Sequence, residues 1–315
     1  MQRGAALGLA LGALALGGAL GFYLLSAPET WRMARGVTIV DDKRTPDLAN
    51  GERLFNAGGC TSCHSVPGQN DRLQLGGGLA FDTPFGILHA PNISQDRNQG
   101  IGAWSLGDFA RAMREGVSPQ GRNYYPAFPY TSYQRMTPSD IADLYGYLKT
   151  LPASTQVSKP HQMAFPFNIT RGLGLWKLAF LDGKPFTPDP ARDAQWNLGA
   201  YLVNGPGHCA ECHSPRNAAG AIIPSLRFAG GPDPEGKGFV PNITQADNGL
   251  KKWSAGDIAE LLKSGFTPDY DSVGGTMAPV VKNMARLSDA DRMAMGVYLK
   301  SLPAIETPPR PAKKQ

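Results

Sequence analysis

A five-residue motif with two cysteines and a histidine occurs twice in this sequence. It reads C-x-x-C-H at residues 60–64 and again at residues 209–213, and these two copies hold all four cysteines of the chain. The spacing is typical of covalent c-type haem attachment, in which two thiols add to the haem vinyl groups and the adjacent histidine ligates the iron. The candidate attachment residues are Cys60, Cys63, Cys209 and Cys212, and the candidate axial ligands are His64 and His213.

A structural zinc site is the alternative interpretation of four cysteines. Four thiolates would satisfy a tetrahedral zinc ion. Zinc would not require a histidine directly after each cysteine pair, whereas both copies of the motif have one. The sequence therefore favours two covalently bound haem c groups, each with its iron, as the cofactors.

The second axial ligand of each iron decides what the haem does. Met277 lies 64 residues after His213, in a sequence GGTMAP that predicts a conformationally restricted loop. A thioether opposite a histidine gives a six-coordinate iron with a raised potential, which suits electron transfer. We therefore expect Met277 to be the sixth ligand in the second site.

The first site lacks this methionine. The residue 64 positions after His64 is Phe128, which has no atom that ligates iron. We therefore expect the first haem to be five-coordinate or to carry a ligand that the second site does not predict. Met136 is one possibility, although its counterpart in the second half, Leu287, suggests a core residue. His89 and His161 are two others, each of which is also interpretable as an ordinary hydrogen-bonded histidine.

The two motifs belong to a tandem repeat. Their offset of 149 residues also pairs Trp104 with Trp253, and the Leu-Pro pairs at 151–152 and 302–303 match at an offset of 151 residues. So small a drift over a whole domain predicts two similar units with one haem each. We assign the units to residues 47–153 and 191–305.

Each unit is predicted to contain three main helices. One leads into the haem motif, and a second begins at a capping box in which a serine side chain bonds free backbone N–H groups. The third ends at the Leu-Pro pair, and 38 Gly and 27 Pro predict long loops in the chain. The expected fold class is mainly α. The helices should begin near residues 48, 105 and 137 in the first unit and near 193, 254 and 288 in the second.

The N-terminal segment is apolar enough to cross a membrane. Residues 4–25 carry no charge, and a bilayer-spanning helix needs about 20 residues. An uncleaved anchor over residues 1–28 is favoured over a cleaved signal peptide, because the exit has no A-x-A-like cleavage site. Covalent haem attachment takes place outside the bacterial cytoplasm, so we expect an inner-membrane protein with its haem domains in the periplasm.

Three connecting segments complete the expected organisation. Residues 29–46 link the anchor to the first unit, and residues 306–315 form a tail that we expect to be disordered. The inter-domain linker, residues 154–190, is rich in aromatic and apolar residues, so it either runs over both units or docks another protein. The net charge of +5 includes no long basic run, which argues against a nucleic-acid partner.

Several short stretches outside the haem motifs match one known family. They are TPFG at 83–86, PNI at 91–93, REGV at 114–117, YPA at 125–127, FPFNI at 165–169 and PFTPDP at 185–190. Through them the chain resembles the membrane-anchored multihaem cytochrome c subunits of bacterial periplasmic dehydrogenases, the type paired with alcohol, gluconate, sorbitol or aldehyde dehydrogenases.

The resemblance implies a tandem pair of class I cytochrome c-like haem domains after an N-terminal transmembrane helix. It also implies haem attached at both cysteine pairs, with axial ligands His64, His213 and Met277. The family's usual members carry three haem motifs and a methionine at the position of Phe128. These two departures put direct quinone reduction and a simple relay role for the first haem in doubt.

We interpret the chain as a non-catalytic electron-transfer subunit of an oxidoreductase complex in a respiratory chain. It would accept electrons from a periplasmic dehydrogenase and pass them to a quinone, a soluble cytochrome or an oxidase. The sequence has no Gly-rich phosphate loop, no G-x-S-x-G elbow and no H-E-x-x-H motif for substrate chemistry of its own. Two other functions stay open: a dihaem peroxidase or small-molecule redox enzyme acting at an open first haem, and a haem-based sensor of gas or redox state.

Overall fold

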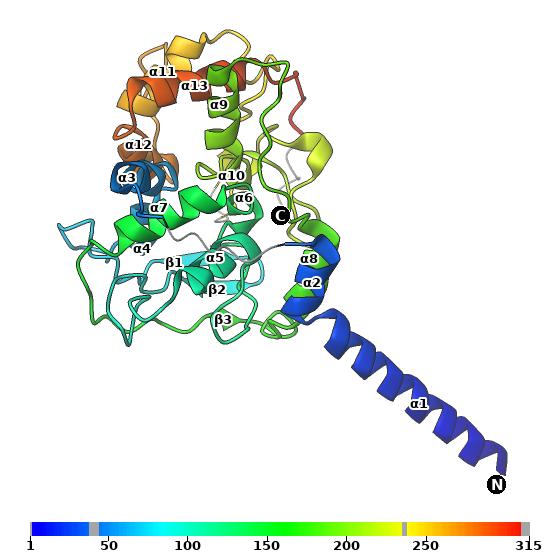
Figure 1. Cartoon of the computed structure of the whole chain (residues 1–315). Helices are drawn as coiled ribbons and strands as arrows, with labels where there is room; N and C mark the ends of the chain where they lie inside the picture. Colours follow the sequence, from blue (N-terminus) through cyan, green and yellow to red (C-terminus); the bar gives the residue numbers. More distant parts are fainter. Residues whose placement is uncertain (1, 38–43, 235–237, 310–315) are drawn as a thin grey trace.

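The chain folds into two helical units from which a long N-terminal helix projects (Figure 1). The computed structural model describes residues 2–37, 44–234 and 238–309. Helices predominate in these ranges, which confirms the expected mainly α fold class.

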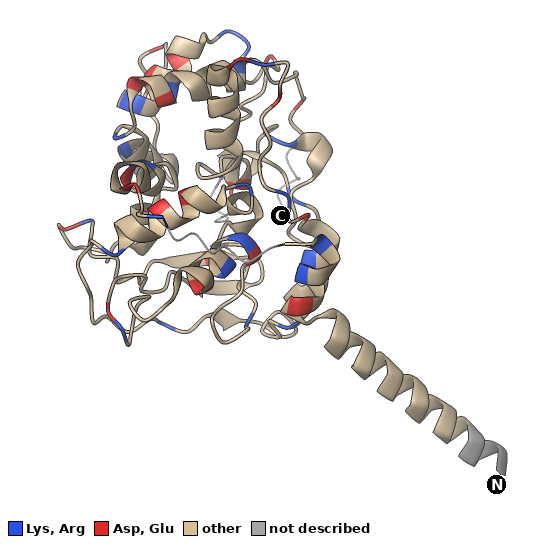
Figure 2. Cartoon of the chain, in the orientation of Figure 1, with Lys and Arg blue, Asp and Glu red and all other residues tan. Residues whose placement is uncertain are grey.

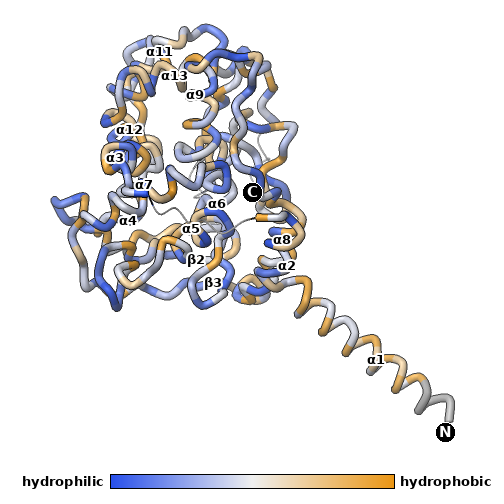
Figure 3. Tube along the Cα trace, in the orientation of Figure 1, coloured by the Kyte–Doolittle hydropathy of each residue, from blue (hydrophilic) through white to orange (hydrophobic). Residues whose placement is uncertain are grey.

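The projecting helix is α1 (Gln2–Leu25), whose 24 residues correspond to about 36 Å at ~1.5 Å per residue. Its stretch from Leu7 to Leu25 has a mean hydropathy of 1.8 and none of it is buried. Figure 2 shows no charged residue between Leu7 and Leu25, and Figure 3 shows this stretch as largely apolar. Length and composition therefore suit a membrane-spanning helix.

The segment expected to be a plain linker, residues 29–46, instead begins with helix α2 (Pro28–Arg35). Trp31 is buried and donates its indole N–H to the Leu181 carbonyl at 3.0 Å. Arg32 donates to the Glu115 carboxylate of the first unit at 2.8 Å. These contacts stabilise the helix, so the beginning of the expected linker is ordered against the first unit and the inter-unit segment. Residues 38–43 of the linker lie outside the described residues.

The first unit packs its helices around a core of apolar side chains beside the first cysteine motif. Its capping box forms as expected, because the Ser105 hydroxyl accepts from the Asp108 N–H and the Asp108 carboxylate accepts from the Ser105 N–H. The helices of this unit are α3 (Leu48–Ala57), α4 (Cys60–His64), α5 (Leu106–Glu115), α6 (Tyr130–Tyr133) and α7 (Pro138–Leu148).

The second unit repeats this plan around its own core. Its capping box at Ser254 and Asp257 also forms as expected. In both units the first helix crosses the last closely: a side-chain carbon at Gly51 would clash with the Asp143 carbonyl, and one at Gly199 with the Ala294 carbonyl. The elements are α9 (Ala194–Asn204), α10 (Ala210–His213), η1 (Pro224–Leu226), α11 (Ala255–Ser264), α12 (Met277–Met284) and α13 (Asp289–Lys300).

Short strands that the sequence did not predict lie within the loops. Strands β1 (Ala80–Thr83) and β2 (Gly86–His89) form an antiparallel hairpin, and β3 (Gln162–Met163) from the inter-unit segment adds to β2. Gly86 has φ +136°, a conformation that favours glycine, where β3 passes close by. A second small pair, β4 (Gly231–Pro232) and β5 (Phe239–Val240), lies in the other unit.

The segment between the units contacts both of them. Its helix α8 (Gly172–Phe180) packs on α2, and the Lys177 ammonium donates to the Gly116 carbonyl of the first unit at 2.8 Å. The Trp176 indole donates to the Ala219 carbonyl of the second unit at 2.9 Å. The segment is therefore positioned to fix how the units sit together.

The expected disordered tail is partly ordered. The Thr307 hydroxyl accepts hydrogen bonds from the side-chain amides of Asn242, at 3.0 Å, and Asn248, at 2.9 Å. Long-range amide contacts thus involve a stretch whose composition suggests disorder. Residues 310–315 lie outside the described residues.

Candidate haem sites

Each cysteine motif forms one short helix, α4 in the first unit and α10 in the second. Residues three apart on a helix share a face, so the two thiols of each pair lie on one side. Among the described residues, no three His, Cys, Asp or Glu side chains come together as a group able to hold a metal ion. The four thiols therefore do not form the single cluster that the zinc alternative requires.

The two motif histidines make the same hydrogen bond. His64 Nδ1 lies 2.8 Å from the Pro91 carbonyl oxygen, and His213 Nδ1 lies 2.8 Å from the Pro241 carbonyl oxygen. Because a carbonyl only accepts, each Nδ1 carries the proton and each Nε2 keeps its lone pair for a metal ion. Desolvation lowers the pKa of both imidazoles, against the opposing effect of these hydrogen bonds, and so favours the neutral ligand form. The donor set thus fits haem iron.

The residue proposed as the second sixth ligand begins a helix. Met277 is the first residue of α12, not part of a loop as expected, and Pro279 follows within the first turn where proline is tolerated. It is half-buried and packs against the cluster that includes Cys209. A thioether thus lies in the same apolar cluster as the second motif.

Aromatic rings occupy the corresponding place in the first unit. Phe128 makes edge contacts with Tyr124, Tyr130 and Tyr133, at centroid distances of 5.9, 6.4 and 5.7 Å. It also packs against the cluster that holds Cys60. The structure therefore places an aromatic group, with no iron-ligating atom, where the repeat places Met277.

The other candidate ligands of the first site lie in two different places. Met136 is 0% exposed in the core cluster against which Cys60 packs, and its counterpart Leu287 is buried in the core of the second unit. The His89 backbone N–H donates to His161 Nδ1 at 3.2 Å, so these two histidines lie together on the β-hairpin side of the unit.

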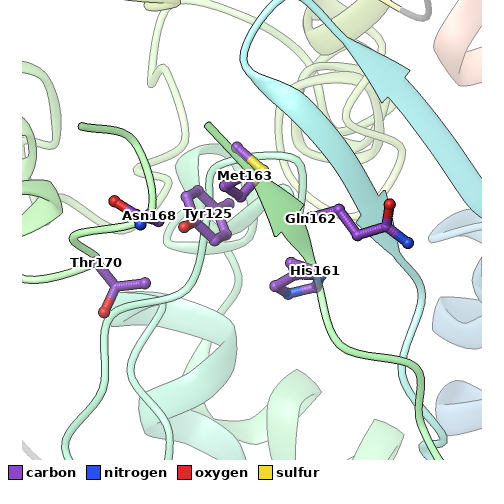
Figure 4. A pocket seen from close by; sticks show the side chains of 6 residues that line it. All are labelled: Tyr125, His161, Gln162, Met163, Asn168 and Thr170. Carbon is purple, nitrogen blue, oxygen red and sulfur yellow. The ribbon is translucent and has the colours of Figure 1, made fainter. Parts of the chain in front are cut away.

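A cavity of about 440 Å³ lies beside His161 (Figure 4). Tyr125 meets His161 edge to face with ring centroids 5.5 Å apart, and its hydroxyl donates to the Phe167 carbonyl at 2.8 Å. Burial, followed by the nearby His89, lowers the pKa of His161 and favours its neutral form. The cavity is lined by Tyr125, His161, Gln162, Met163, Asn168 and Thr170.

A buried carboxylate lies inside the second cysteine motif. Glu211 accepts hydrogen bonds from Thr131 at 2.6 Å and Ser132 at 2.8 Å, both in the first unit, and pairs with Arg216 at 2.8 Å. Burial raises the pKa of Glu211, but Arg216 and the two hydroxyls outweigh burial and hold this pKa below its ordinary value. The carboxylate is therefore ionised at the junction of the units.

Sequence reasoning missed the carbonyls that orient the histidines and the polar contacts between units. The repeated Pro-Asn-Ile stretches at 91–93 and 241–243 were the available signal for the carbonyls. The contacts of Glu211 had no such signal, because their partners lie about 80 residues away in sequence.

Comparison with known protein families identifies two copies of one domain. The family model described as cytochrome c matches residues 48–152 and 197–303. A protein named diheme cytochrome c-type, from Cereibacter sphaeroides, is 47% identical over 312 residues, which cover 97% of this chain and 100% of that protein.

Subunits of dehydrogenases are also similar. The fructose dehydrogenase cytochrome subunit of Gluconobacter japonicus is 37% identical over 82% of this chain and 53% of that protein. The alcohol dehydrogenase (quinone) cytochrome c subunit of Gluconobacter oxydans is 33% identical over 90% of this chain and 61% of that protein. The chain thus spans between about half and three fifths of these two relatives. It belongs to the cytochrome c family, carries two covalently bound haem c groups and functions in electron transfer.

Proposed function

We propose that this chain is the cytochrome subunit of a periplasmic dehydrogenase and passes that enzyme's electrons to a quinone, a soluble cytochrome or an oxidase. The observation that supports this most is the similarity, over four fifths or more of the chain, to cytochrome subunits of fructose and alcohol dehydrogenases. Haem c supplies a reversible one-electron carrier.

The proposed attachment sites follow from the two motifs. His64 and His213 present Nε2 to iron because their Nδ1 atoms are held by backbone carbonyls. Met277 supplies the sixth ligand in the unit at 191–305, whereas Phe128 leaves the unit at 47–153 without a matching ligand. The haem c groups are bound through Cys60 and Cys63 in one unit and Cys209 and Cys212 in the other.

Membrane attachment through α1 is part of the proposal. The Arg171 guanidinium donates to the Tyr23 carbonyl at 2.6 Å and lies 4.1 Å from the centre of the Tyr23 ring, near the end of α1. Tyrosine and arginine are typical of membrane–water interfaces. Phe165, Phe167 and Ile169, close to Arg171 in sequence, are exposed. These features support haem units held against a membrane surface, and the periplasmic side follows from covalent haem attachment outside the bacterial cytoplasm.

One observation favours a second function at the first haem, that of a peroxidase or another small-molecule redox enzyme. The Tyr130 hydroxyl is buried and has no hydrogen-bond partner among the residues that the structure describes, and its ring contacts Phe128. A polar group in this position would serve a small ligand of an open iron. Peroxide turnover by the purified protein would support this function.

The electron-transfer proposal is tested on protein made in a host that matures c-type cytochromes. We expect two haems per chain by pyridine haemochrome, and one in a Cys60→Ala/Cys63→Ala variant or a Cys209→Ala/Cys212→Ala variant. Carbon monoxide should bind one haem of the reduced wild type. A wild-type mass without two haems would contradict the site assignment.

The partner is tested on protein isolated from its own host in mild detergent. A dehydrogenase should copurify, and its substrate should reduce the haem. A preparation that contains both haems but no dehydrogenase, and that the host's membrane dehydrogenases do not reduce, would contradict the partner assignment.

A further inference from the structure

One buried amide connects the second unit to the first cysteine motif. Asn283, on α12, is 3% exposed. Its side-chain oxygen accepts from the Thr61 hydroxyl at 2.8 Å, and its NH₂ donates to the Ser62 hydroxyl at 2.9 Å and to the Pro279 carbonyl at 2.9 Å. Thr61 and Ser62 are the two residues between the cysteines of the first motif. The amide oxygen and both amide hydrogens are thus used.

An equivalent contact joins the first unit to the second cysteine motif. The offset of 151 residues at this end of the repeat makes Ser132 the counterpart of Asn283, and the offset of 149 at the motif makes Glu211 the counterpart of Ser62. Ser132 donates to Glu211 at 2.8 Å. Each unit therefore contacts the other unit's cysteine motif through the same position, as in a two-fold symmetric dimer.

A second pair of contacts obeys the same symmetry. Asp140 begins the last helix of the first unit and accepts from the Tyr201 hydroxyl of α9. Its counterpart Asp291 accepts from Arg53 of α3 at 2.6 Å. The interface between the units is thus built twice from equivalent positions.

The symmetry ends at the two segments that contain Met277 and Phe128, called here the sixth-ligand segments. Six residues separate Met277 from Asn283 along α12, a rise of about 9 Å. Gly274 and Gly275 before this helix are exposed, so the chain that enters it is weakly held. α12 itself packs on α3 and α4 of the first unit (Figure 1) as well as on α11.

We infer that Asn283 is a positioning residue through which the first cysteine motif fixes the sixth ligand of the second haem. By binding Thr61 and Ser62, it holds α12, and with it Met277, at a set place relative to the first unit. The inference rests on the proposed ligand role of Met277. According to this inference, Thr61 and Ser62 of the first haem motif influence how the iron of the second unit is ligated.

The test uses the absorption band that ferric haem shows when a methionine ligates its iron. Added imidazole displaces the methionine and removes this band, so the imidazole concentration at half loss measures how firmly the methionine is held in each of three variants. Asn283→Ala and Thr61→Val/Ser62→Ala should each lower the imidazole concentration at half loss roughly tenfold, on the scale of one or two net hydrogen bonds. They should also lower the potential of the second haem. The control, Tyr201→Phe, breaks a contact between the units that involves neither cysteine motif nor α12, and it should leave both readouts unchanged.

The outcomes separate this inference from the ligand assignment. Met277→Ala should abolish the band; a band that survives it refutes the ligand role, and the inference with it. If Met277→Ala abolishes the band but the Asn283 and Thr61/Ser62 variants titrate like wild type, only the inference fails. It fails too if Tyr201→Phe has an equal effect, because the effect would then be one of general interface stability. Should Asn283→Ala not fold, the Thr61/Ser62 variant decides alone.

Discussion

Lys177 provides a prediction whose size follows from the structure. Its side chain is 0% exposed, and its ammonium donates to the Gly116 carbonyl and the Asn123 side-chain oxygen, each at 2.8 Å. It also lies 5.0 Å from the centre of the Tyr130 ring. Burial lowers the pKa of Lys177 to about 7, despite the attraction of Glu115. The charge on Lys177 therefore lowers the free energy of unfolding.

The cost depends on pH in a definite direction. The ordinary lysine pKa is 10.5, so the shift to about 7 corresponds to about 5 kcal/mol at ~1.36 kcal/mol per pKa unit. Above pH 10.5 neither state holds the proton and nothing is lost. As the pH falls, the unfolded chain takes up the proton first, so the free energy of unfolding declines down to about pH 7. Below that pH the whole penalty is present.

The assay is urea unfolding of wild type and Lys177→Met at pH 7, 8 and 9. The stability of the wild type relative to the variant should rise by about 2.3 kcal/mol over the range, with a slope that approaches about 1.4 kcal/mol per pH unit above pH 8. Methionine leaves the buried Asn123 oxygen unpaired, at a cost of about 1–3 kcal/mol that does not change with pH, whereas the Gly116 carbonyl still accepts from the Tyr124 N–H at 2.8 Å. Lys184→Met, at an exposed lysine, is the control and should follow the wild type. A difference between wild type and Lys177→Met that does not change with pH would refute the reasoning.

Two further predictions concern contacts that join segments. Glu211→Gln should lower the free energy of unfolding by about 2 kcal/mol, because the half-buried Arg216 loses the buried carboxylate with which it pairs; urea unfolding measures this, and an unchanged midpoint would contradict it. Trp31→Ala leaves a cavity, so it should make the free energy of packing α2 on α8 less favourable by about 3–5 kcal/mol. Trypsin should then cut near Arg32 and Arg35 faster while the haem spectrum stays the same, and an unchanged cutting rate would contradict the role of Trp31.

Local chemistry made much of this fold predictable from the sequence. The capping serines Ser105 and Ser254 bond backbone groups three residues away, so the sequence alone contains the whole interaction. The same is true of the last helices, whose N-caps are Thr137 and Ser288, as expected. The cysteine motifs likewise contain their own spacing, which is why the cofactor prediction held.

Non-local contacts account for what the sequence did not reveal. The Asn283 side chain meets partners 221 and 222 residues away, and a buried asparagine near a helix end has no pattern that names them. The glycines before Met277 suggested a loop, but an α-helix begins at Met277 itself and includes Pro279. The hairpin at 80–89 depends on β3, whose two residues come from beyond the first unit.

The two units therefore differ less in fold than in what covers their sixth-ligand segments. Tyr130, two residues after Phe128, packs in a buried cluster with Trp31 of α2 and Leu181 of the inter-unit segment. In the second unit the chain that leads to Met277 is exposed, with Tyr270 at 91% exposed. The segments outside the repeat thus surround the Phe128 region with aromatic side chains, whereas the chain that leads to Met277 is exposed to solvent. Because most of the repeat is symmetric, we expect any difference between the two haems to arise from these added segments and from phenylalanine in place of methionine at the proposed sixth-ligand position.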